Sequence, residues 1–138
     1  MPTFTPGSSY GNGAAWICPT ACTSDFVGAG WMSPGYAGGQ RYDAVKKWVA
    51  PCAGTVTITN NTVSLQSPAS TLGTVCTIKK NTTTQGTPIT LTPGNPSQPY
   101  ILSPFTVVAG DAVYFIVSSV GTNPAGDATL WTPKITLQ

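Results

Sequence analysis

The chain has 138 residues, enough for one domain with a single hydrophobic core. Charged residues make up 7% of it, while 41% are hydrophobic and regularly patterned, which excludes a disordered polar chain. The net charge of +2 comes from six scattered basic residues, which excludes the clustered basic surface of a nucleic-acid-binding protein. No apolar run approaches the ~20 residues that a membrane-spanning helix needs, so we expect no membrane contact.

The first part of the chain, residues 1–40, is rich in glycine and proline, which predicts a succession of turns rather than strands. We therefore predict an irregular aromatic N-terminal arm or cap over residues 1–40, and a folded domain over residues 41–138. Either its rings cover one end of the domain, or some stay exposed to a sugar or a protein neighbour. The candidates for ligand or partner contacts are Trp16, Trp31, Tyr36 and Tyr42.

Short segments of alternating apolar and polar residues follow in the predicted domain. Residues 55–59 form an amphipathic strand, with Val56 and Ile58 facing inward. Asn60-Asn61 then predicts a turn, after which residues 63–65 would return as the second strand of a hairpin. Further strands are expected at residues 74–80 and 89–91.

The most strand-like segment is residues 112–117, which follow a turn signal. Both of its alternating faces are largely apolar, which suits the middle of a sheet inside a sandwich. Residues 129–137 alternate as well, and we predict one half-buried strand there, near a sheet edge because it contains Pro133. Trp48 and Trp131 are expected to stack inside the domain and hold its first and last strands together.

About eight strands and no helical period predict an all-β fold. We expect a jelly-roll-like antiparallel β-sandwich, with a Greek-key sandwich of immunoglobulin type as the alternative.

Four cysteines allow three complete disulfide pairings. We predict one disulfide between Cys18 and Cys22 and another between Cys52 and Cys76. Free buried thiols and a zinc ion bound by all four cysteines are the alternatives.

Catalytic groups are scarce, since the chain has no histidine and no glutamate. This removes histidine-based nucleophile activation and general acid–base chemistry. Asp111 and Asp127 both precede predicted strands, where an aspartate accepts hydrogen bonds in a turn; a calcium ligand is the alternative. We therefore predict no catalytic residue, no metal site and no cofactor, and a protein that is not an enzyme.

Two stretches together resemble a known family. Residues 48–58 read W-x-A-P-x-x-G-x-V-x-I, while residues 109–117 and 127–135 read A-G-D-x-V-x-F-x-V and D-x-T-x-W-x-P-x-I. The pattern is similar to jelly-roll modules of the galactose-binding-like, carbohydrate-binding-module type in bacterial surface and secreted proteins. The resemblance implies a jelly roll over residues 41–137 and a possible glycan partner, and it leaves residues 1–40 without a counterpart.

These observations favour a non-enzymatic structural or adhesive surface module. We expect a decoration (cement) or minor capsid protein of a phage or virus particle, located on the virion surface or otherwise extracellular. Its partners would be protein neighbours, and residues 1–40 would be the contact element. The alternatives are a carbohydrate-binding module of a secreted or cell-surface protein, and an extracellular filament subunit whose arm adds a strand to a neighbour's sheet.

Overall fold

The computed structural model describes residues 5–7, 15–17, 26–27, 30–123 and 125–138. Within these residues the fold is antiparallel β throughout, and the one helical element is the short 3-10 turn η1 (Pro68–Ser70). No helix in this part of the chain is long and apolar enough to cross a membrane.

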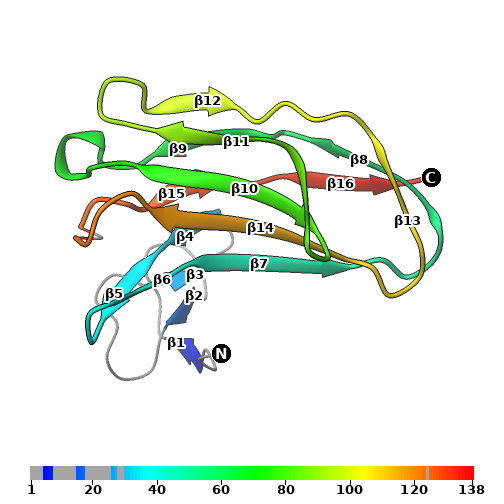
Figure 1. Ribbon diagram of the computed structural model, residues 1–138, viewed down its shortest axis with the longest axis horizontal. Helices are drawn as coiled ribbons and strands as arrows, with labels where there is room; N and C mark the ends of the chain where they lie inside the picture. Colours follow the sequence, from blue (N-terminus) through cyan, green and yellow to red (C-terminus); the bar gives the residue numbers. More distant parts are fainter. Residues whose placement is uncertain (1–4, 8–14, 18–25, 28–29, 124) are drawn as a thin grey trace.

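One layer of the molecule is a four-stranded antiparallel sheet (Figure 1). Its strands, in spatial order, are β11 (Thr83–Leu91), β10 (Thr74–Lys80), β14 (Ala112–Ser119) and β7 (Ala44–Val49). The apolar segment at residues 112–117 therefore lies inside the sheet, as its sequence predicts, with a hydrogen-bonded neighbour on each side.

The second layer is built from three chain segments that each carry two short strands. They are β12 and β13 (Ser97–Pro99, Phe105–Val107), β8 and β9 (Gly54–Thr59, Thr62–Leu65), and β15 and β16 (Thr129–Trp131, Lys134–Leu137). In the middle segment, β8 pairs with β13 and β16, whereas β9 pairs with β12 and β15. Each segment thus acts as one long, interrupted strand.

The predicted hairpin at Asn60-Asn61 is wrong, because β8 and β9 continue in one direction along the same partner segment. The pairing register shifts by one residue between Thr59↔Lys134 and Val63↔Trp131, which marks a β-bulge. Asn60 adopts φ of 52°, a conformation that asparagine tolerates in a bulge as well as in a turn. The opposite segment breaks in the same place, so residues 129–137 form two strands rather than one.

The order of the strands defines a jelly roll, which confirms the predicted sandwich. A fourth member of the second layer, β4 (Trp31–Ser33), pairs with β15. When each interrupted segment is counted as one strand, the chain crosses between the layers at every connection from β4 onward except one, the hairpin between β10 and β11. The hairpin β5–β6 (Gly35–Ala37, Gln40–Tyr42) is an addition between β4 and β7 and belongs to neither layer. Two four-member layers with these crossings have jelly-roll topology.

Within residues 1–40, the structure differs from the predicted arm, because short strands occur there. β1 (Thr5–Gly7), β2 (Ala15–Ile17) and β3 (Phe26–Val27) extend the second layer beyond β4. Met32 in β4 is completely buried in the main core, so the sandwich begins before residue 41. Strands of two or three residues are too short to show an alternating pattern, which explains why the sequence did not indicate them.

The centre of the core is Trp131, whose side chain is 0% exposed. Its ring meets Phe115 of the other layer edge-on at 5.4 Å between centroids and stacks on Tyr100 at 5.9 Å. These rings, rather than the predicted Trp48, are its aromatic partners. Trp48 is only partly buried and packs against both core clusters.

The close approach of Gly73 to Leu91 can be tested by mutation. Gly73 has a φ of +118°, which favours glycine, and an added Cβ would collide with the carbonyl oxygen of Leu91. We expect Gly73→Ala to lower the free energy of unfolding by about 2–4 kcal/mol. Gly94→Ala is the matched control, since nothing lies within 4 Å of the place that an added Cβ would take there. Urea unfolding followed by tryptophan fluorescence measures the stability of both variants. An equal loss of stability in the two would contradict the close contact between Gly73 and Leu91.

Candidate functional site

The aromatic residues predicted to contact a ligand are not gathered on one sheet face. Trp31 lies in β4 of the second layer, opposite Leu130 of β15. Tyr36 and Tyr42 lie in the separate hairpin β5–β6, and all three of these rings are half-buried. Trp16 lies in β2, and its side chain is outside the described part of the structure.

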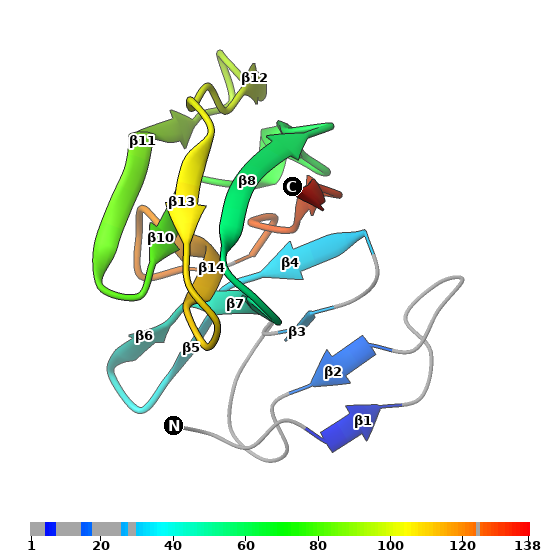
Figure 2. The ribbon, with the colours of Figure 1, turned by 90° about the vertical axis from the view of Figure 1, so that its right-hand side faces the viewer.

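The hairpin β5–β6 is attached to the end of the four-stranded layer. The Arg41 guanidinium donates hydrogen bonds to the carbonyl oxygens of Ser119 and Val120, both at 3.2 Å. Figure 2 places this hairpin beside β7 and β14, on the side away from the second layer. The hairpin that carries Tyr36 and Tyr42 is therefore held at the end of β14.

The solvent face of the four-stranded layer, which we call the outer face, carries the side chains of β7, β14 and β10 that alternate away from the core. Tyr114 lies at its centre, directly opposite Lys47 on one neighbouring strand and Lys79 on the other. The Lys47 ammonium nitrogen is 5.7 Å from the centre of the Tyr114 ring, a cation–π contact. Sequence reasoning missed this ring between two cations.

The alternation of residues in β14 could have indicated that Tyr114 faces outward. Val113 and Phe115 are buried on one face, so Tyr114 must lie on the other. Because both faces are apolar, the sequence alone indicated burial on both sides.

The predicted disulfide between Cys52 and Cys76 is wrong, since both thiols are free. Through β14, Cys76 lies level with Ala44 at the start of β7. Cys52 follows Val49, at the other end of a strand that spans roughly 16 Å, whereas bridged Cα atoms lie within about 7 Å. The same separation excludes a zinc ion shared by all four cysteines. Cys18 and Cys22 lie outside the described residues.

A buried polar network surrounds Asp127, which is 1% exposed. One carboxylate oxygen accepts a hydrogen bond from the Thr71 hydroxyl, which in turn accepts the Gly73 N–H at 2.8 Å. The other oxygen is buried without a protein partner among the described residues. These contacts tie the loop that contains Thr71 to the loop before β15. No group of three or more His, Cys, Asp or Glu that could hold a metal occurs in the described chain.

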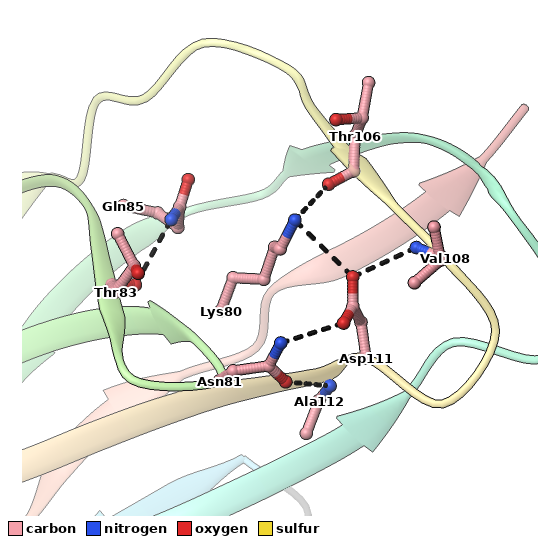
Figure 3. A network of polar contacts seen from close by, with 8 residues as sticks. All are labelled: Lys80, Asn81, Thr83, Gln85, Thr106, Val108, Asp111 and Ala112. Carbon is pink, nitrogen blue, oxygen red and sulfur yellow. Dashed lines mark hydrogen bonds and ion pairs between the residues drawn. The ribbon is translucent and has the colours of Figure 1, made fainter.

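Asp111 organises the opposite end of the molecule (Figure 3). Its carboxylate accepts hydrogen bonds from the Asn81 amide at 2.8 Å and the Val108 N–H at 3.0 Å, and the Lys80 ammonium lies 3.4 Å away. The Asn81 hydrogen bond, followed by the Val108 hydrogen bond, lowers the pKa of Asp111. The predicted role of Asp111 in a turn is confirmed.

Comparison with protein-family models, curated proteins and solved structures finds no match to this chain. The arrangement of its side chains and strands is therefore the basis for any functional argument.

The Asp111 network predicts a pH dependence of stability. The pKa of Asp111 is lower in the folded chain than the value of about 3.9 for an unfolded aspartate. Its stabilising contribution is therefore present above that value and is lost as the pH falls through the folded pKa. We expect the difference in urea midpoint between wild type and Asp111→Asn to be larger at pH 7 than at pH 2. Asn81→Ala should reduce the wild-type pH dependence, and identical profiles for all three proteins would contradict this role.

The two described cysteines should differ in reactivity. Cys52 is exposed, whereas burial raises the pKa of the Cys76 thiol to about 12. Iodoacetamide at pH 8 should alkylate Cys52 in the folded protein and Cys76 only after denaturation. Peptide mass spectrometry without reductant measures both sites, and a peptide that joins the two cysteines would contradict the structure.

Proposed function

We propose that this protein is a non-enzymatic structural module of a larger surface assembly, such as the decoration layer or minor capsid proteins of a phage or virus particle. One observation carries the proposal: the second layer extends beyond the sandwich. The strands β3 and β4 contact β7, the last strand of the four-stranded layer, and β2 and β1 continue past it (Figures 1 and 2).

Among the described strands, none faces β1 and β2 from the other layer, and a sheet segment of this kind is stabilised when a partner covers it. The register of the extension places Trp16 opposite Val27 and Ile17 opposite Phe26, so apolar residue types predominate there. Among the described strands, β1 pairs with β2 alone, and its other edge is open. Open edges and unbacked apolar sheets are typical sites of strand addition or of packing against a neighbouring protein.

The roles of the carboxylates also support a non-enzymatic module. Asp111 is held by hydrogen bonds and an ion pair within its turn, and Asp127 is buried between two loops. Within the described part of the chain, their carboxylates accept hydrogen bonds from Thr71, Asn81 and the Val108 N–H, whereas the general acid and base of a glycoside hydrolase face each other across the substrate.

The alternatives have different geometric support. A filament subunit would use the same extension, with an open rather than a closed arrangement of neighbours. A carbohydrate-binding role through the N-terminal rings has less support, because Trp31 and the two hairpin tyrosines belong to different sheets. The resemblance to carbohydrate-binding modules stays a prediction.

Removal of residues 1–20, which include β1 and β2, tests the proposal. We expect the complete chain to form species larger than a dimer of the 14.2 kDa monomer, and the shortened chain to lose them. Light scattering after size exclusion and electron microscopy measure the assembly, and circular dichroism checks that the sheet signal persists. A complete chain that stays monomeric at high concentration, or an assembly that the deletion leaves intact, would contradict the proposal.

A further inference from the structure

The outer face of the four-stranded layer carries three rows of side chains that run across the strands. The register fixes these rows for β7, β14 and β10, and Asp43, which directly precedes β7, continues the alternation of its outward residues by one step. From one end to the other, the rows are Asp43–Ser118–Val75, Val45–Ile116–Thr77 and Lys47–Tyr114–Lys79.

The two outer rows are complementary to each other at their positions on β7 and β14. On β7, an acid at Asp43 stands on one side of the central row and a base at Lys47 on the other. On β14, the small side chain of Ser118 corresponds in the same way to the large ring of Tyr114. A half-turn about an axis along the central row would exchange the outer rows, so that acid meets base on β7 and large meets small on β14, while Lys79 meets the aliphatic Val75 on β10.

Within the described part of the chain, the charged side chains of this face lack ionic partners. Among the described residues, the only ion pair is between Lys80 and Asp111, which leaves Asp43, Lys47 and Lys79 without one. The central row presents the half-buried aliphatic side chains of Val45 and Ile116 to solvent. A partner that covered this face would bury the aliphatic row and could pair the charges.

We propose that the outer face binds a second copy of this chain, with a two-fold axis along the row of Val45, Ile116 and Thr77. In this arrangement Lys47 of each copy lies against Asp43 of the other, and Tyr114 lies against Ser118. Such self-complementarity defines an isologous contact, and two sheets pack face to face at about 10 Å. The proposal deepens the proposed function and rests on it, since it supplies a second contact for the assembly.

A second copy fits this face better than a sugar or an acidic protein segment. Beside Tyr114 the face offers hydroxyl and aliphatic groups, with few of the planar polar side chains that orient a bound ligand. An acidic segment would satisfy the lysines but would place negative charge near Asp43. The second copy alone supplies an acid for Lys47 and a base for Asp43 by symmetry.

The size of the face sets the expected strength of the contact. Three strands about 4.8 Å apart and seven residues long cover roughly 330 Å². This is less than the ~800 Å² that each partner buries in a stable complex of standard size, so we expect a weak dimer. Contacts through the N-terminal strands would strengthen it by raising the effective concentration of the second copy.

Exchange of the two charges tests the contact in the complete chain. We expect Asp43→Lys and Lys47→Asp each to weaken self-association by about tenfold, because each places like charges together twice per dimer. The double variant should restore association to the wild-type level. Lys134→Asp is the matched control, because it makes the same charge change at an exposed position of the other layer and should have no effect. Sedimentation equilibrium measures association, and circular dichroism checks folding.

The results separate this inference from the proposed function. Unchanged association in both single variants, or no rescue in the double variant, would overturn the two-fold contact even if the deletion of residues 1–20 abolishes larger species. Charge-dependent dimers that the deletion leaves unchanged would support the contact and contradict the role of the N-terminal strands. A wild-type chain that is monomeric at every concentration would overturn both.

Discussion

The burial of Trp131 between the two layers is the interaction on which the rest of the fold depends. Its ring contacts Phe115 of the four-stranded layer and Tyr100, which follows β12 in the second layer. A buried indole N–H must find an acceptor, and here the Asn61 side-chain oxygen accepts it at 2.9 Å. Asn61 also donates from its amide to the Tyr100 carbonyl at 3.0 Å. The bulge that contains Asn61 is therefore tied to the core, because one amide bonds both the indole of Trp131 and the backbone carbonyl of Tyr100.

The two ends of the sandwich are closed by aspartates that act on loops. Asp111 holds its own turn to the turn between β10 and β11 through Asn81, whereas Asp127 holds two loops together through Thr71. The hydrogen bonds of these two carboxylates hold the loops at both ends of the sandwich in place.

The two proposed contacts leave the molecule in different directions. The N-terminal strands continue the plane of the second layer, while the outer face lies on the opposite side of the four-stranded layer (Figure 2). A subunit with two contacts of different direction can join neighbours into an extended layer or a closed shell, whereas a single isologous contact ends at a dimer. The uncharged, threonine-rich edge strand β11 is compatible with close packing of many copies.

The sequence by itself determined the all-β class, the interior position of residues 112–117 and the turn role of Asp111. Each of these depends on local alternation or on turn chemistry, which neighbouring residues specify. Tertiary structure decided that Asn60-Asn61 is a bulge, that Cys52 and Cys76 are far apart, and that Tyr114 faces outward between two lysines. These features depend on register between strands distant in the chain and on which face meets the other layer. Alternation reports that a strand has two faces, but only packing between the layers selects the one that is buried.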